Sequence, residues 1–269
     1  MDMTTTYISS TQNPKIKQLL TLQQKSAERR REGLFVVEGL RELQHCIEGG
    51  YTVDTVFHQP DICPPLPTLE AGVRRFEVSD AVYRKIAYRS GTEGVVALVR
   101  TRQLNLDDLQ LSTDPLLMVV ESVEKPGNLG AILRSADAAG ADAVIVCDPL
   151  TDLQNPNLIR SSVGAFFSVP TVACTSAECI GFLKQHAIRI LTAQLQDSCL
   201  YYDTDMRQPT AIVMGTEATG LTNVWREAAD AHIRIPMLGR IDSLNVSVSA
   251  AILLFEAVRQ RQGKANVAK

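Results

Sequence analysis

The sequence predicts an α/β protein in which a small N-terminal α/β module precedes a larger domain built on a parallel sheet. In the second half of the chain, two apolar runs at 116–120 and 143–147 flank a helix with one apolar face, which is a β–α–β pattern. Before residue 100, short apolar runs alternate with helical segments. A polar connector with turn residues lies at 101–115. We therefore predict two domains, residues 1–105 and 106–269.

The elements follow from the apolar periodicity and the residues that begin and end helices. Residues 13–31 read as one helix, which Asn13 can cap and whose first turn suits Pro14. In the first domain we also expect strands at 35–37, 53–57 and 95–99 and a helix at 40–47. In the second domain we expect strands at 116–120, 143–147, 168–173, 189–193, 211–214 and 232–235, with helices from about Leu129 and at 157–165, 176–186, 222–230 and 245–261.

Charge is distributed unevenly along the chain. The formal net charge is −3, but residues 1–105 hold 14 Lys/Arg and 12 Asp/Glu, whereas residues 106–269 hold 13 and 18. The positive charge of the first domain is concentrated in the helix at 13–31. The two domains therefore have different electrostatic characters, which predicts different roles.

Several functional classes are disfavoured by composition and motifs. The sequence has neither an apolar run of ~18 residues nor a secretory signal pattern, so we expect a cytoplasmic protein without a membrane span. The six cysteines show no CxxC spacing and the four histidines no HExxH motif, so we expect reduced thiols and no metal site. The GxGxxG fingerprint is missing, and Leu221 replaces the lysine of a phosphate-binding loop, which argues against an ATPase or GTPase.

Three segments that follow predicted strands carry candidate site residues. The first is KPGNLGAILRSADAAGA at 125–141, in which Asn128 can cap a helix and Arg134 lies off the apolar stripe. The second is the glycine-bounded loop GTEATGLT at 215–222, and the third runs from 233 to 257, where Ser243 is a candidate helix cap. Because ligands of open parallel sheets bind at the carboxyl ends of strands, these segments predict one shared site.

The final predicted helix, 245–261, is apolar on nearly all sides. Such a helix is normally buried on most faces. It therefore predicts either a subunit interface or a central core helix of a monomer.

These segments, in this order and spacing, resemble the SpoU/TrmH family of RNA ribose 2′-O-methyltransferases in the SPOUT superfamily. N128-L-G-A-I-L-R134-S-A, M214-G-T-E217-A-T-G220-L and I235-P-M237-L-G-R-I-D-S243-L-N245-V-S match the three motifs of the family. R160-S-S-V-G-A resembles the helix between the first two, and residues 8–38 resemble, more loosely, the ribosomal-protein-like RNA-binding module with which many such enzymes begin. The resemblance implies a deep trefoil knot at the C-terminal end of the parallel sheet, a rare exception to ordinary topology, and a homodimer through this knotted region.

The resemblance also implies S-adenosylmethionine as the methyl donor and a division of roles among the site residues. The family pattern assigns the catalytic positions to Asn128, Arg134, Glu217, Ser243 and Asn245, and the cofactor pocket to Thr192, Met214, Gly215, Gly220, Ile235, Met237 and Leu244. Arg134 matches the position proposed as the base, but a guanidinium normally stays protonated, so phosphate binding or stabilisation of the alkoxide is the alternative. Glu217 is the alternative base.

RNA is the expected partner, with ribosomal RNA favoured over transfer RNA. The residues expected to contact phosphates are Lys15, Lys17, Lys25, Arg29, Arg30, Arg31, Arg74 and Arg75. Two other activities remain open at this point: a catalytically silent RNA-binding protein with the same fold, and a base rather than ribose methyltransferase. The motifs favour the ribose enzyme.

Overall fold

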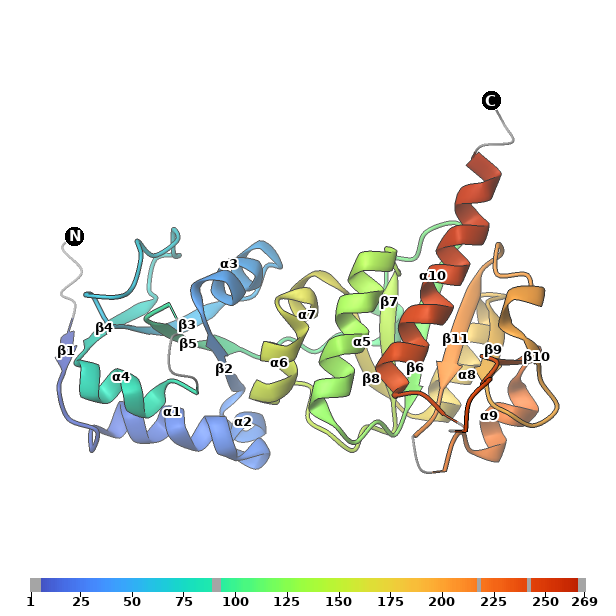
Figure 1. The fold of residues 1–269 in the computed structure, drawn as a ribbon. Coiled ribbons are helices and arrows are strands. Elements are labelled where there is room, and N and C mark those ends of the chain that lie inside the picture. Colours follow the sequence, from blue (N-terminus) through green and yellow to red (C-terminus); the bar gives the residue numbers. More distant parts are fainter. Residues whose placement is uncertain (1–5, 89–92, 217–218, 241–242, 266–269) are drawn as a thin grey trace. The chain divides into compact units, whose positions relative to one another are not determined.

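The computed structural model describes residues 6–88, 93–216, 219–240 and 243–265 (Figure 1). The chain forms two compact units: unit 1 comprises Met1–Arg102 and Asp152–Ser168, and unit 2 comprises Gln103–Thr151 and Val169–Lys269. The sequence placed residues 152–168 in the second domain, whereas their packing places them in unit 1. The reason is aromatic packing across a long sequence separation: Phe166 and Phe167 contact Phe35 and Tyr51, with ring centroids 5.2–6.4 Å apart.

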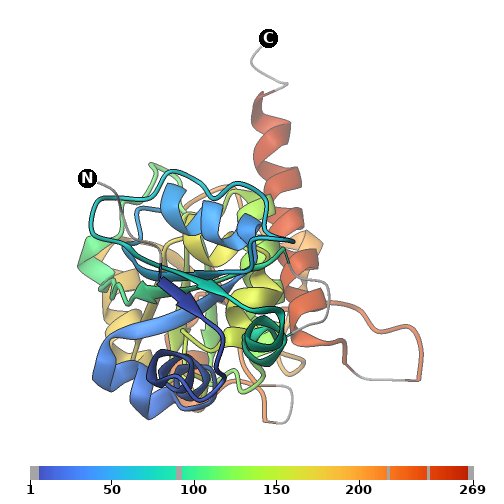
Figure 2. The same cartoon turned by 90° about the vertical axis from the view of Figure 1, so that its left-hand side faces the viewer.

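Unit 1 is built on a five-stranded mixed sheet with the order β1-β4-β3-β5-β2. Its strands are β1 (Thr6–Ile8), β2 (Leu34–Glu38), β3 (Val53–His58), β4 (Arg74–Val78) and β5 (Val95–Arg100), and its helices are α1 (Pro14–Gln24), α2 (Ser26–Glu32), α3 (Leu40–Glu48), α4 (Asp80–Ile86), α6 (Pro156–Ser162) and α7 (Ala165–Ser168). Helices α1 and α4 lie side by side beneath one face of the sheet (Figure 2). Strands β1 and β4 and helix α4 were not predicted.

The alternation of side chains along β2 fills two cores. Leu34 and Val36 pack with apolar residues of α1 and α4, while Phe35 points to the other face and packs against the aromatic rings named above. The sheet is therefore covered on both faces within unit 1.

The predicted single helix 13–31 is two helices. Asn13 caps α1 as predicted, because its Oδ1 accepts a hydrogen bond from the N–H of Lys15 at 2.9 Å. At Lys25 the backbone becomes extended (φ −114°, ψ 110°), and a new helix, α2, begins at Ser26. This break turns α2 so that the guanidinium of Arg29 donates to the carbonyl oxygen of Leu22 at 2.6 Å. In an uninterrupted helix, Leu22 and Arg29 would instead be separated along a single axis, so this hydrogen bond depends on the break at Lys25.

Unit 2 is built on a seven-stranded sheet in which every pairing is parallel, with the order β10-β12-β9-β11-β6-β7-β8. Its strands are β6 (Leu116–Glu121), β7 (Ala143–Cys147), β8 (Thr171–Cys174), β9 (Arg189–Ala193), β10 (Cys199–Leu200), β11 (Thr210–Met214) and β12 (Ala231–Arg234). The central strands β6, β7 and β11 are completely buried, as in other parallel sheets covered on both faces. The parallel sheet and the predicted strands of this domain are confirmed within a few residues.

Helices cover both faces of this sheet. They are α5 (Pro126–Ala139), α8 (Ser176–Gln185), α9 (Asn223–Ala228) and α10 (Val246–Ala265), with short 3-10 turns at Leu106–Asp108 and Tyr201–Asp203. Helices α5 and α10 lie side by side (Figure 1). Helices α8 and α9 pack together elsewhere on the sheet, where Trp225 and Phe182 join a core with Leu117 and Val119. Within the described residues, no helix is long and apolar enough to cross a membrane.

Two predicted helix caps are wrong, and both errors bear on the site. Helix α5 begins at Pro126 with Lys125 as its cap, so Asn128 lies inside the first turn and its side chain does not cap the helix. Helix α10 begins at Val246, and Asn245, not Ser243, accepts the hydrogen bond from the N–H of Ser247, at 3.0 Å. Asn128 and Ser243 are good capping residues by type, but the backbone geometry fixes which position is the cap.

Candidate cofactor and catalytic site

A cavity of about 390 Å³ lies at the carboxyl ends of β9, β11 and β12 in unit 2. Most of the predicted pocket residues line it, together with one predicted catalytic residue: Met214, Gly215, Gly220, Ile235, Met237, Leu244 and Ser243. Gln194, Leu195 and Thr216 also line it and were not predicted. The volume lies within the range of ordinary small-molecule sites, and the lining mixes apolar side chains with a few polar groups.

Glycines shape the described parts of the segment that follows β11, residues 215–216 and 219–222. The N–H groups of Thr216 and Gly220 each donate to the other's carbonyl oxygen, at 3.2 and 3.1 Å, and Gly220 adopts a left-handed conformation (φ +68°). A Cβ on Gly215 would lie 2.2 Å from the backbone carbon of Gly220, so no other residue fits there without a backbone shift. The loop therefore brings backbone groups close to the cavity.

A buried carboxylate holds the far end of this loop. Glu121, the last residue of β6, accepts hydrogen bonds from Thr222 at both oxygens: from the N–H at 2.9 Å and from the hydroxyl at 2.7 Å. The hydroxyl of Ser176 lies 3.2 Å from the same carboxylate and accepts the indole N–H of Trp225 at 3.0 Å. These contacts join β6, α8 and α9 to the loop, and none of them was predicted. The available signal was an acidic residue at the end of an otherwise apolar strand.

Two of the predicted catalytic residues meet where α5 and α10 begin. The amide nitrogen of Asn245 donates to Oδ1 of Asn128 at 3.2 Å, and Oδ1 of Asn245 accepts from the N–H and hydroxyl of Ser247. A smaller hollow of about 150 Å³ is lined by Asn128 and Lys125 and shares Gly215, Thr216 and Val246 with the larger cavity. The first and third sequence motifs are thus brought together beside the second.

Other predicted site residues lie apart from this group. Arg134 is exposed on α5, ~9 Å along the helix axis from Asn128, and lines neither cavity. Thr192 is fully buried and its hydroxyl lies 2.6 Å from Nδ1 of His232, so it lies behind the cavity wall and not on it. Glu217 lies outside the described residues.

The predicted phosphate-binding residues of unit 1 have unequal environments. Lys17, Lys25 and Arg30 are exposed and Lys15 is half-buried, whereas Arg31 is exposed and forms ion pairs with Glu28 and Glu32. Arg74 pairs with Asp54, and Arg75 is half-buried.

Arg29 is wrongly predicted as a phosphate contact. Its side chain is only 3% exposed, and it forms an ion pair with Asp152 at 2.6 Å. A guanidinium in that environment is not available to an RNA backbone, so the residue is structural.

Comparison with known proteins decides the family. Residues 115–255, more than half of the chain, match the SpoU rRNA Methylase family, and residues 13–97 match the MRM3-like substrate binding domain. The chain belongs to the SpoU rRNA methylase family. This confirms the resemblance seen in the three motifs and the presence of an N-terminal substrate-binding domain.

Relatives and solved structures match nearly the whole chain. The 23S rRNA (uridine(2479)-2′-O)-methyltransferase of Streptomyces viridochromogenes is 32% identical over 263 residues, which cover 94% of this chain and 92% of the relative. A crystal structure of an RNA 2′-O ribose methyltransferase is 40% identical, with a TM-score of 0.83 and coverage of 95% of this chain and 99% of its own. The AdoMet-bound rRNA methyltransferase from Sinorhizobium meliloti is 27% identical, with a TM-score of 0.86 and coverage of 95% and 98%.

Proposed function

We propose that this protein transfers a methyl group from S-adenosylmethionine to a ribose 2′-hydroxyl of ribosomal RNA. The observation that carries the proposal is that residues of the three SpoU motifs line two adjoining cavities at the strand ends of unit 2, where Asn245 of the third motif donates a hydrogen bond to Asn128 of the first. Membership in the SpoU family and full-length similarity to 23S rRNA 2′-O-methyltransferases support the substrate class. Because the proposed substrate is ribosomal RNA, we place the protein in the cytoplasm.

The larger cavity fits S-adenosylmethionine. Met214, Ile235, Met237 and Leu244 offer apolar surface for an adenine ring, and the close approach of Gly215 to Gly220 keeps the loop backbone near the ligand. The polar groups of the lining supply partners for the ribose and amino acid ends. When bound, the cofactor supplies an electrophilic methyl group.

The residues beside the cavity orient the acceptor hydroxyl. Transfer forms a bond between the 2′-oxygen and the methyl carbon and breaks the bond between that carbon and sulfur, while the hydroxyl proton leaves to a base. The Asn128–Asn245 pair and Ser243 position the ribose, because holding the reactants in line is a large part of such catalysis. Arg134 binds the RNA phosphate or steadies the developing alkoxide, and Glu217 is the candidate base.

Unit 1 docks the RNA. Its match to a substrate binding domain and its exposed basic side chains Lys17, Lys25 and Arg30 support this role. Lysine and arginine contacts to phosphates release counterions, so binding is expected to weaken as the salt concentration rises.

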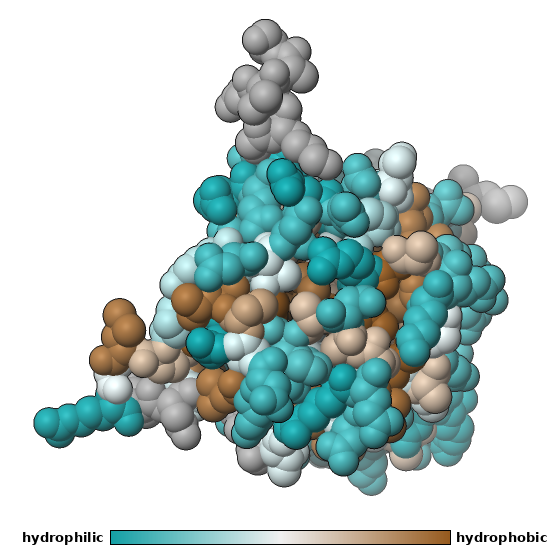
Figure 3. Space-filling model, turned by 90° about the vertical axis from the view of Figure 1, so that its right-hand side faces the viewer, coloured by the Kyte–Doolittle hydropathy of each residue, from teal (hydrophilic) through white to brown (hydrophobic). Residues whose placement is uncertain are grey.

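A homodimer formed through the C-terminal region, where the family resemblance predicts a knot, completes the proposal. Helix α10 buries one face against unit 2 but leaves Val248 and Phe255, two turns apart, 47% and 48% exposed. Leu195, Leu238 and Leu244 are further exposed apolar residues of the unit, and hydrophobic residues lie among hydrophilic ones on the side drawn in Figure 3. Phe255→Asp should shift the protein toward a monomer in light scattering, and an unchanged mass would contradict this interface.

Methyl transfer can be measured directly. Purified protein is incubated with tritiated S-adenosylmethionine and ribosomal RNA from cells that lack the protein, and the digested RNA is analysed for 2′-O-methylnucleosides. We expect label in one such nucleoside, strongly reduced in Asn128→Ala and Arg134→Ala and unchanged in Arg207→Ala, which removes an exposed arginine away from the cavity. Label in a base, or RNA binding without transfer, would support one of the two alternative activities.

A further inference from the structure

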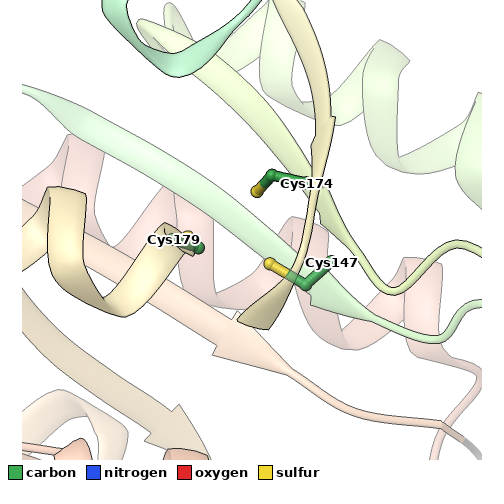
Figure 4. A group of neighbouring side chains, drawn as sticks. All are labelled: Cys147, Cys174 and Cys179. Atoms are coloured by element: carbon green, nitrogen blue, oxygen red, sulfur yellow. The ribbon is translucent and has the colours of Figure 1, made fainter. Parts of the chain in front are cut away.

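Three of the six cysteine side chains converge in unit 2. Cys147 ends β7, Cys174 ends β8, and Cys179 lies in the first half of α8. Their sulfur atoms all lie within 4.8 Å of one another (Figure 4). The other three cysteines lie elsewhere, Cys46 and Cys63 in unit 1 and Cys199 in β10. The expectation of no metal site was based on the lack of CxxC and HExxH spacings in the sequence. Those spacings do not reveal a cluster that forms only when distant residues meet in the fold.

The surroundings of the cluster combine enclosure with access. Cys147 and Cys179 are buried, whereas Cys174 is half-buried. Cys174 directly precedes Thr175, the cap of α8, so the cluster lies beside the N-terminus of a ten-residue helix. The partial positive charge of a helix N-terminus favours thiolates, the form in which cysteine binds metals. Cys174 therefore lies partly accessible to solvent, while Cys147 and Cys179 lie in the core behind it.

The distances suit a single ion. Three sulfur ligands bound at ~2.3 Å lie ~3.8 Å apart around a tetrahedral ion and ~4.0 Å apart in a trigonal plane, so three thiols within 4.8 Å of one another need to move by about 1 Å or less. Thiolates select soft cations such as Zn²⁺ and Cu⁺, while Mg²⁺ and Ca²⁺ require oxygen ligands. Among the described residues, no fourth histidine, cysteine, aspartate or glutamate joins the group.

We propose that Cys147, Cys174 and Cys179 form a binding site for one thiophilic d¹⁰ cation. The shared chemistry is coordination by three thiolates: Zn²⁺ would add a water molecule in its fourth position, and Cu⁺ would bind in a trigonal plane. None of the three residues lines the proposed cofactor cavity, so the site is separate from methyl transfer. A bound ion would join the ends of β7 and β8 to α8, close to Ser176 of the network around Glu121.

The test uses the full-length protein, reduced, stripped of metal and kept free of oxygen. Zn²⁺ and Cu⁺ are titrated separately, each against a competing chelator. We expect one equivalent of at least one cation to bind, to slow alkylation of Cys174 by iodoacetamide at least about tenfold, and to raise the thermal unfolding midpoint. Alkylation of Cys63, which is also half-buried, should not change. Binding of Zn²⁺ alone indicates the tetrahedral form, and binding of Cu⁺ alone the trigonal form.

Two substitutions localise the ion. Cys174→Ser and Cys179→Ser should each weaken binding by at least about tenfold and abolish the rise in midpoint, while the matched control Cys63→Ser should behave like the wild type. The midpoint of each metal-free variant shows that it folds. The proposal is overturned if neither cation binds stoichiometrically to the reduced protein, or if Cys174→Ser and Cys179→Ser bind as tightly as the control. It is also overturned if the cation protects Cys63 in place of Cys174.

Discussion

Replacing Arg29 by alanine should destabilise unit 1 far more than replacing its neighbour Arg30. The two residues are adjacent in a run of three arginines, and both were expected to contact RNA. Arg29, however, donates to the carbonyl oxygens of Leu22 and Gln23 at 2.6 and 3.3 Å and pairs through two nitrogens with Asp152 at 2.6 and 2.7 Å. Arg30 is exposed.

The expected cost follows from what alanine would leave behind. The Asp152 side chain is only 10% exposed, so Arg29→Ala would leave a mostly buried carboxylate without its ion-pair partner. Breaking a buried pair in this way costs about 3–5 kcal/mol, a large part of the stability of an ordinary domain. Arg30→Ala should change the free energy of unfolding by no more than about 0.5 kcal/mol.

Hydrogen exchange is the appropriate assay, because the only tryptophan, Trp225, lies in unit 2 and its fluorescence reports on that unit. In Arg29→Ala, peptides from α2 and from residues 152–168 should lose protection, whereas those in Arg30→Ala should match the wild type. Arg30→Ala should instead flatten the salt dependence of RNA binding. If both variants lose less than about 1 kcal/mol, the ion pair does not hold residues 152–168 in unit 1.

Three further predictions test the cavity and unit 1. Gly215→Ala places a Cβ against the backbone of Gly220; overpacking of about 1–3 kcal/mol should weaken S-adenosylmethionine binding about 10–100-fold in calorimetry, and unchanged affinity would show that the loop adapts. Glu121→Gln replaces an acceptor of Thr222 by a donor and should cost about 1–3 kcal/mol of stability while raising KM for the cofactor; a stability loss without a KM change would make the residue purely structural. Burial lowers the pKa of His58, so the folded state favours the neutral imidazole; that contribution to stability is present above pH ~6.5 and is lost as the pH falls below it, and His58→Gln should flatten the slope of the urea midpoint between about pH 7 and pH 5.

Local patterns were enough for most strands and for the site segments, although β1, β4 and β10 were missed. The strands β6, β7 and β11 are buried on both faces, so each is a continuous apolar run. Such a run can be recognised in the sequence without knowing which strands pair with it. The three motifs lie in segments that follow strands, and parallel pairing necessarily brings strand ends together at one edge. The three site segments could therefore be grouped from local sequence patterns, whereas the individual cavity residues were assigned through the family resemblance.

Features that depend on distant residues could not be predicted. The burial of Arg29 depends on its ion pair with Asp152, more than 120 residues away, and a run of arginines carries no sign of that partner. The same limit explains the cysteine cluster, because Cys147 and Cys174 meet only through the pairing of β7 with β8. Asn128 and Ser243 were wrongly predicted as helix caps, because capping preference identifies a residue type but not its position.

The most direct test of the central claim is the mass-spectrometric analysis of nucleosides from ribosomal RNA treated with this protein and S-adenosylmethionine. We expect one additional 2′-O-methylnucleoside, formed by the wild type and Arg207→Ala and strongly reduced with Asn128→Ala and Arg134→Ala. A methyl group on a base, or RNA that remains unmethylated although both cofactor and RNA are bound, would contradict ribose 2′-O methylation by this protein.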